Sequence, residues 1–229
     1  MEFKIIWKSS RAVCIELVEE GIVYTDNYTV FIDGEPMLTS DRVVQSIYGL
    51  KRYTEYRLTL SRGDQTSAEM TFRTEPEFVT LNVRDFGAMG DDVHNDTLAI
   101  QAAILSCPPH SRVYVPEGIY KVSSLFMKSG IIFELGKGAV LSAYTDRTYF
   151  PILPGLIQSY DEASEYNLAS WEGNPLDSFA SIITGIGVSD VTICGEGSIE
   201  CNASYENWWQ GEGRKKTGGA FRPRSIFLN

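Results

Sequence analysis

The chain has little of what metal or redox chemistry requires. Its 229 residues include four cysteines and two histidines. The cysteines have neither metal-ligand nor redox-motif spacing, so we expect no structural zinc site, and nothing in the sequence implies a cofactor. They are Cys14, Cys107, Cys194 and Cys201. Four free thiols are typical of a protein in a reducing cytoplasm.

Positive charge is also scarce. There are 20 Lys and Arg residues against 30 Asp and Glu residues, which gives a formal net charge of −10. This balance argues against nucleic acid or an anionic membrane as the partner, since both require a basic surface. No apolar run approaches the length of a membrane span. The opening MEFKIIWKSSRAV lacks the apolar core and cleavage site of a signal peptide, so we expect a cytoplasmic location.

Alternating strand patterns fill the first part of the chain, to about Pro76. Phe3–Trp7, Ala12–Glu16 and Tyr28–Ile32 alternate as half-buried strands do. Asp33-Gly34 is a hairpin turn signal. The pattern predicts a small antiparallel β-sandwich.

A second feature of this part is Leu50 followed by Thr54-x-Tyr56. It resembles the tyrosine corner of fibronectin type III domains, in which the phenol bonds back to nearby backbone. Residues 1–76 are therefore predicted to form a fibronectin type III-like domain. Its role is either carbohydrate binding or that of a spacer. Its aromatic residues lie mostly at inward-facing positions, which favours the spacer: Trp7, Tyr28, Phe31 and Tyr56.

The chain changes character between Leu81 and Ile104. Asp96 stands at an N-cap position, and the pattern predicts one helix over 97–107, ended by prolines. One helix ahead of many short strands predicts a plug over the open apolar end of a β-solenoid. Its apolar face is predicted to contain Leu98, Ile100, Ile104 and Leu105. On this prediction Leu98→Asp buries an unpaired charge and destabilises the fold strongly.

Short strands then recur with the spacing of a solenoid coil. Apolar triplets return after about nineteen to twenty residues, from Val113 to Ile132 and from Val122 to Leu141. Residues 144–177 break the repeat and are rich in aromatic and acidic side chains. Long excursions from a solenoid usually form the walls of a binding groove.

Two motifs carry a family resemblance. Asp85–Ala88, Gly90-Asp91 and Asp96-Thr97 resemble the opening of pectin-lyase-like right-handed β-helices. Gly195–Asn202, followed by Trp208-Trp209, resembles a segment of glycoside hydrolase family 28, the polygalacturonases. Asn202 belongs to a Glu-Cys-Asn run where that family has an Asp-Gly turn. The resemblance implies an all-β fold in which residues 77–229 form the N-terminal portion of a right-handed parallel β-helix.

The family resemblance also implies a reaction. Polygalacturonases hydrolyse α-1,4-galacturonan with inversion, using one carboxylic acid and carboxylate bases on opposite faces of the bond. The family carries these groups in later coils, so we expect the catalytic residues beyond Asn229 and an inactive chain by itself. Gly90-Asp91-Asp92 is similar to the catalytic Gly-Asp-Asp, but it precedes the helix and is predicted to be a turn.

Candidate substrate contacts come from two segments. Ser170–Gly173 resembles a Trp-Glu-Gly segment of exo-acting bacterial members, which makes Trp171 and Glu172 candidates, although the Trp could simply pin its loop. Arg222 and Arg224 end a basic run with Arg214, Lys215 and Lys216, and arginine binds carboxylates bidentately. The alternative for this run is a solvated loop. Trp208-Trp209 could stack on sugars, but packing is favoured.

The family resemblance thus implies a galacturonate-containing polysaccharide or oligosaccharide of the cell wall as the partner, as in pectin degradation, and an exo-acting mode. Two other functions remain open. One is a non-catalytic pectin-binding or structural β-helix. The other is a polysaccharide lyase, which requires Ca²⁺ and a basic catalytic Arg or Lys.

Overall fold

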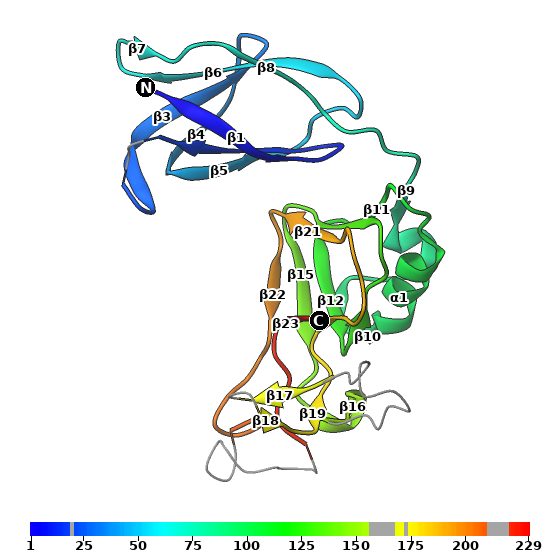
Figure 1. The fold of residues 1–229 in the computed structure, drawn as a ribbon. Helices are drawn as coiled ribbons and strands as arrows, with labels where there is room; N and C mark the ends of the chain where they lie inside the picture. The colour runs from blue at the N-terminus through cyan, green and yellow to red at the C-terminus, as the bar shows by residue number, and fades with distance from the viewer. Residues whose placement is uncertain (19–20, 156–167, 172–173, 210–219) are drawn as a thin grey trace, which may run out of the picture. The chain divides into compact units, whose positions relative to one another are not determined.

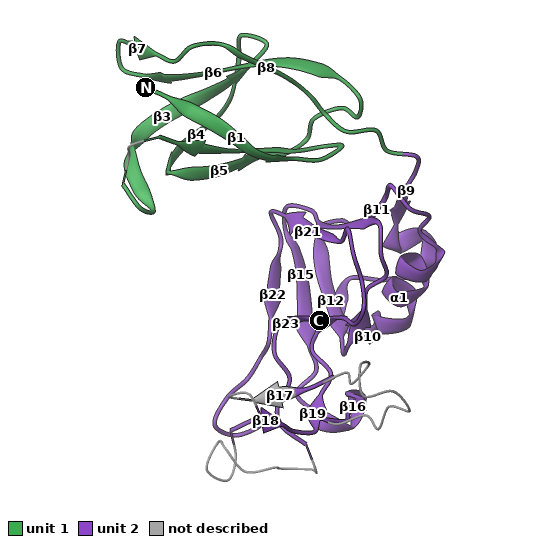
Figure 2. Cartoon of the chain, viewed as in Figure 1, with its two compact units in different colours: residues 1–77 green, residues 78–229 purple. Residues whose placement is uncertain are grey.

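The computed structural model describes residues 1–18, 21–155, 168–171, 174–209 and 220–229. The chain divides into two compact units, residues 1–77 and 78–229 (Figure 2).

The first unit consists of two antiparallel β-sheets (Figure 1). One has the order β1-β2-β5, from strands Phe3–Lys8, Val13–Leu17 and Val44–Ile47. The other has the order β4-β3-β6-β7, with β8 also paired to β6; its strands are Tyr24–Ile32 (β3), Glu35–Arg42 (β4), Glu55–Arg62 (β6), Gln65–Thr66 (β7) and Met70–Arg73 (β8). In β2 the side chains that join the core of this unit are Val13, Ile15 and Leu17, while Ala12 and Cys14 are also buried but lie outside this core cluster.

The bond expected of a tyrosine corner is present. The Lys51 backbone N–H donates to the Tyr56 hydroxyl at 2.8 Å. The C-terminal end of the unit is held by Glu77, whose carboxylate accepts from the Ser10 hydroxyl at 2.6 Å and pairs with Arg11 at 3.1 Å. The assignment to the fibronectin type III class itself stays a prediction.

The second unit is a stack of parallel β-coils, as predicted. Its first sheet has the order β9-β11-β14-β21: Thr80–Asn82, Ser111–Val115, Ile131–Leu135 and Thr192–Gly195. Its second has the order β10-β12-β15-β22: Asp91–Asn95, Gly118–Val122, Ala139–Ala143 and Ser198–Glu200. Its third has the order β13-β20-β23: Leu125–Phe126, Ile183–Gly185 and Ile226–Leu228. The chain visits the sheets in turn, so each coil adds one strand to a sheet.

The coil spacing is 20 residues between β11 and β14 of the first sheet, as predicted, and 21 between β12 and β15 of the second, but the residues that pair differ from the predicted ones by one or two positions. Val113 pairs with Phe133 rather than Ile132, and Val122 pairs with Ala143 rather than Leu141. The paired residues were misplaced because apolar residues occupy several neighbouring positions in these strands, so similarity between triplets does not determine which residues pair. A slip of one residue would exchange the inward and outward faces. Sequence similarity between apolar triplets therefore located the coils but not their pairing.

Both glycines of the Gly195-x-Gly197 motif are required because a side chain at either position would collide with neighbouring backbone. A side chain at Gly195 would collide with the Leu135 carbonyl group, and one at Gly197 would lie 2.6 Å from the Ala139 carbonyl oxygen. Gly195 also has a φ of 121°, which L-residues with a side chain rarely adopt. The motif is thus needed where this coil passes closely over the previous one.

Helix α1 spans Thr97–Ser106 and buries Ile100, Ala103 and Ile104 in the core of the second unit. The prediction for its other apolar residues is wrong. Leu98 is 80% exposed and Leu105 is 63% exposed, on a second apolar stripe that faces solvent. A helix with apolar residues on two sides has no single apolar face, so the periodicity could not select the buried one. Leu98→Asp would therefore not bury a charge.

Asp96 stands at the predicted N-cap position of α1 but makes no side-chain bond to the helix. Asp96 is instead buried, with 1% of its surface exposed. Its carboxylate accepts hydrogen bonds from the backbone N–H groups of Met89, at 2.6 Å, and Gly90, at 3.0 Å. The Asn95 side chain accepts from the Thr97 N–H instead, at 3.0 Å. The carboxylate thus fixes the opening loop onto the helix start.

The excursion between β15 and β20 carries short elements. They are the 3₁₀ helix Arg147–Tyr149 and strands β16 (Ile152–Leu153), β17 (Ser170–Trp171), β18 (Asn174–Pro175) and β19 (Ser178–Phe179). β16 pairs with β19 and β17 with β18, both antiparallel. In Figure 1 these strands gather at one side of the coils. No helix in the described ranges is long and apolar enough to cross a membrane.

Candidate functional site

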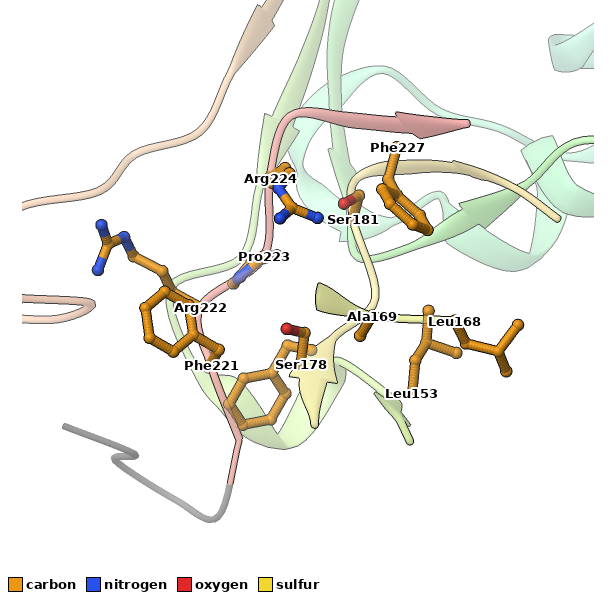
Figure 3. Close-up of a pocket in the computed structure, with 11 residues that line it drawn as sticks. Leu153, Leu168, Ala169, Ser178, Ser181, Phe221, Arg222, Pro223, Arg224 and Phe227 are labelled. Atoms are coloured by element: carbon orange, nitrogen blue, oxygen red, sulfur yellow. The ribbon is translucent and has the colours of Figure 1, made fainter. Parts of the chain in front are cut away.

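A hollow lies where the excursion meets the last described coil (Figure 3). Its lining is mostly apolar, and its two charged residues are both arginines. The lining residues are Leu153, Leu168, Ala169, Ser178, Phe179, Ser181, Phe221, Arg222, Pro223, Arg224 and Phe227. A mostly apolar hollow with a few charged or polar groups in its wall is a common form of small-ligand site.

The segment that carries the two arginines is anchored at both ends. The Phe221 N–H donates to the Asp177 carbonyl at 2.7 Å, and the Phe221 carbonyl accepts from the Phe179 N–H at 2.8 Å. Further along, the Arg224 carbonyl accepts from the Ile182 N–H at 3.3 Å. Pro223 has a fixed φ and also confines the residue before it to extended backbone. Arg222 and Arg224 therefore project from a held backbone.

The two arginines point in different directions. Figure 3 shows Arg224 directed toward Ser181 and Phe227, and its guanidinium carbon lies 5.3 Å from the centre of the Phe227 ring. Arg222 extends away from the other lining residues in the same view. Its guanidinium carbon lies 3.8 Å from the centre of the Trp209 ring. The structure thus brings both predicted residues to one hollow, with Arg224 inside it and Arg222 at its rim.

The same segment also lines a second hollow. There Arg222, Pro223 and Arg224 are joined by a different set of residues: Ala143, Tyr144, Phe150, Ile182, Cys201, Ala203 and Trp208. The Arg-Pro-Arg segment is therefore a wall shared by two depressions of the surface.

The other predicted contacts are only partly described. Trp171 lies in β17, where its backbone pairs with Asn174 of β18. Leu168 and Ala169, just before this strand, line the first hollow. Glu172 lies outside the described residues, as do Arg214, Lys215 and Lys216.

The tandem tryptophans have separate environments. Trp208 is 5% exposed and makes edge contacts with Phe150 and Phe179, each at 5.5 Å between ring centres. Arg147 donates to the Trp208 carbonyl at 3.2 Å and lies over its ring. The predicted packing role is confirmed for Trp208. Trp209 is 39% exposed, so packing does not describe it.

The Gly90-Asp91-Asp92 run has the contacts of a turn. The Asp91 carboxylate accepts from the backbone N–H groups of Val93 and His94, both at 3.0 Å, and lies 2.7 Å from the His94 ring nitrogen. Asp92 pairs with Lys121 at 3.2 Å. The backbone hydrogen bond from His94 is the main reason that the pKa of Asp91 falls to about 2. A carboxyl group that loses its proton there is a poor general acid near neutral pH.

In the described part of the chain, no group of three or more His, Cys, Asp or Glu side chains could hold a metal ion.

The stacked parallel coils define the class of fold, a pectate-lyase-like β-helix. The family model described as rhamnogalacturonase A/epimerase, pectate lyase-like, matches residues 80–143. The solved structure of a family 28 exopolygalacturonase from Yersinia enterocolitica superposes with a TM-score of 0.60 at 23% identity, covering 88% of this chain and 41% of that one.

The chain also matches curated relatives in sequence. The exo-poly-alpha-D-galacturonosidase of Dickeya chrysanthemi is 29% identical over 162 residues, which is 67% of this chain and 26% of that protein. Mannuronan C5-epimerase AlgE1 of Azotobacter vinelandii is 29% identical over 133 residues, which is 57% of this chain and 9% of that protein. The right-handed β-helix fold and the resemblance to exopolygalacturonases are thus confirmed. The chain spans about a quarter of the length of the galacturonosidase.

Proposed function

We propose that this chain is the substrate-binding part of a polygalacturonase-type hydrolase that acts on α-1,4-linked galacturonate from one end of the polymer. The observation that carries the proposal is the pair Arg222 and Arg224, which line one hollow on an anchored backbone. The sequence resemblance to an exo-poly-alpha-D-galacturonosidase supports the same choice of substrate.

A uronate needs such a counter-charge because each sugar unit bears a carboxylate. This chain has a net charge of −10, so a polyanionic sugar will not be attracted by the molecule as a whole. Local arginines must supply the attraction, and a guanidinium matches the two oxygens of a carboxylate. The apolar lining from Leu153, Phe179 and Phe227 suits the C–H faces of a sugar ring.

The hollow lined by Arg222 and Arg224 is proposed to bind the galacturonate chain but not to cleave its glycosidic bond. Inverting hydrolysis requires an acid and a base on opposite faces of the bond. Arginine supplies neither, because its guanidinium stays protonated.

The first unit is proposed to be a fibronectin type III-like spacer. The free cysteines support a cytoplasmic location, which is part of the same proposal.

The test is calorimetric titration of the purified chain with trigalacturonate at low and moderate salt. Arg224→Gln should weaken binding by about tenfold or more, since a hydrogen bond to a charged group contributes about 1.5–3 kcal/mol. Lys137→Gln is the matched control, because Lys137 is exposed on a turn and the variant makes the same change of charge.

The fully methyl-esterified trigalacturonate, which lacks the charge, should bind weakly to the unmodified chain. Thermal melts of each variant separate a loss of contact from a loss of fold. Equal affinity of Arg224→Gln and the unmodified chain for trigalacturonate would contradict the proposal. Tight binding that never accompanies hydrolysis, in this chain or in a longer protein that contains it, would favour the non-catalytic pectin-binding alternative.

A further inference from the structure

Trp209 and Tyr205 form an exposed aromatic pair outside the first hollow. Tyr205 is 86% exposed and Trp209 is 39% exposed. Their ring centres are 6.4 Å apart and the rings are inclined by 45°. Arg222 reaches this pair from the rim of the hollow, with its guanidinium carbon 3.8 Å from the centre of the Trp209 ring. Two exposed rings and a cation thus lie together on the surface of the second unit.

The loop that carries the rings is held by asparagine side chains. Asn202 takes a φ of 52°, which asparagine tolerates, and its side-chain amide donates to the Ala143 carbonyl at 2.8 Å. The Asn207 amide donates to the Asn202 carbonyl at 3.0 Å, and its oxygen accepts from the Ser204 N–H at 2.7 Å. Finally the Trp209 N–H donates to the Ser204 carbonyl at 3.1 Å. The loop is therefore tied to β15 and to itself.

Trp208 fixes the direction of its neighbour. Its ring is buried between Phe150 and Phe179, and Arg147 holds its carbonyl group. With Trp208 held inward and the following N–H bonded to Ser204, the Trp209 ring is left on the outer side of the turn. The exposure of Trp209 thus follows from a built loop rather than from a lack of partners.

From this arrangement we infer that Tyr205, Trp209 and Arg222 form a second uronate-contact surface, a platform that lies beside the hollow and shares Arg222 with it. An aromatic ring takes the C–H face of a sugar, while an arginine takes its carboxylate. The guanidinium carbon of Arg222 lies over the Trp209 ring at 3.8 Å from its centre, so the cation and the ring are already in contact. The arginine is also preorganised by the ring, which reduces the entropy lost on binding.

The identity of the sugar rests on the proposed function, but the platform can be tested separately. The probe is trigalacturonate, titrated into chain labelled with ¹⁵N at the tryptophan indoles, with the four indole signals assigned by Trp→Phe variants. The Trp209 signal should move and saturate, while that of Trp7 in the first unit stays fixed. Trp209→Ala and Tyr205→Ala should each weaken binding by about three- to tenfold.

The chain offers a matched control for Tyr205→Ala. Tyr53 of the first unit is also an exposed tyrosine, 63% exposed, with Arg73 over its ring at 5.2 Å. Tyr53→Ala should leave affinity unchanged. Trp209→Phe keeps a ring under Arg222 and should retain most of the affinity, which separates the platform from a general effect on folding.

The outcomes separate this inference from the proposed function. Binding that depends on Arg224 but leaves the Trp209 signal and the affinity of Trp209→Ala unchanged overturns the platform and keeps the function. A saturating Trp209 shift with no effect of Arg224→Gln keeps the platform and counts against the hollow. No binding of trigalacturonate to the folded chain overturns the platform.

Discussion

The Arg112 guanidinium lies 2.8 Å from the Glu134 carboxylate, between the neighbouring parallel strands β11 and β14. The side chains are 11% and 10% exposed, so the pair is nearly buried although it stands on the outward face of its sheet. Arg112 also donates to the Thr80 hydroxyl of β9 at 3.2 Å. One charged pair therefore ties the strands of three successive coils.

Removing one member of this pair should destabilise the second unit. Glu134→Ala leaves the Arg112 charge nearly buried without its carboxylate, and breaking such a pair costs about 3–5 kcal/mol. The measurement is urea unfolding followed by circular dichroism. Glu196→Ala is the control, since Glu196 is exposed, and it should change stability by less than about 0.5 kcal/mol. The double variant Arg112→Leu/Glu134→Ala should recover part of the loss; equal stability of Glu134→Ala and the unmodified chain would show that the pair is not holding the coils.

Helix α1 provides a prediction with an internal control. Ile100 is 0% exposed and Leu98, on the same helix, is 80% exposed. Ile100→Asp buries an unpaired charge and should destabilise by about 4 kcal/mol or more, whereas Leu98→Asp should stay within about 0.5 kcal/mol. Thermal melts of both variants make the comparison. Similar melting temperatures for the two variants would contradict the burial of Ile100 against the first coil.

These two stripes of α1 show what the sequence could and could not predict. The coil pattern, the single helix and the tyrosine corner follow from local spacing, because turns and strand periods are local. The buried face of α1 depends on which side meets the coils, and the strand register depends on which of two adjacent apolar residues turns inward. Neither choice is recorded in local spacing. The strands and the helix were thus predictable, but their contacts were not.

The site shows the same division. Arg222 and Arg224 were recognised from their charge, since positive residues are rare in this chain. The difference between Trp208 and Trp209 was missed because it is set by partners distant in sequence, namely Phe150, Phe179 and Arg147. A signal that was available is the pair Asn202 and Asn207 in the preceding loop, which predicts a turn there.

Cys194 should be chemically inert. Burial, and next the neighbouring Glu134 charge, raise the pKa of its thiol from 9.0 to about 12. The thiolate is the reactive form, so at pH 8 only about one Cys194 in 10⁴ is reactive. The pKa of the Cys194 thiol in the folded chain lies above its ordinary value of 9.0. The stability that this thiol contributes is therefore fully present below pH 9 and is lost as the pH rises toward 12. Iodoacetamide labelling with peptide mass spectrometry should show slower labelling of Cys194 in the folded chain than in urea; equal rates would contradict the raised pKa.

The pKa of Asp91 is shifted in the opposite direction, below its ordinary value. Its pKa falls from 3.8 to about 2, chiefly through the His94 backbone hydrogen bond. The folded pKa is the lower one, so the stability that this group contributes is present above about pH 3.8 and is lost as the pH falls toward 2. Carboxyl ¹³C NMR of the folded chain measures the midpoint directly, with exposed Asp190 as a comparison in the same spectrum. A midpoint for Asp91 near or above 4 would reopen an acid role for this residue.

The final prediction concerns hydrolysis, and it separates Asp91 from a catalytic acid. The purified chain should release no reducing ends from polygalacturonate or trigalacturonate, even where it binds them. The carboxylate of Asp91 is held ionised by two backbone N–H groups and His94, while Asp92 is paired with Lys121, so neither is poised to protonate a glycosidic oxygen. A reducing-sugar assay, with the Dickeya exo-poly-alpha-D-galacturonosidase as positive control, makes the measurement. If the chain does hydrolyse either substrate, Asp91→Asn and Asp92→Asn should be compared with Asp190→Asn, whose φ of 54° asparagine also tolerates. Activity lost in either of the first two variants but kept in Asp190→Asn would mean that the opening loop, and not only the arginine-lined hollow, meets the substrate.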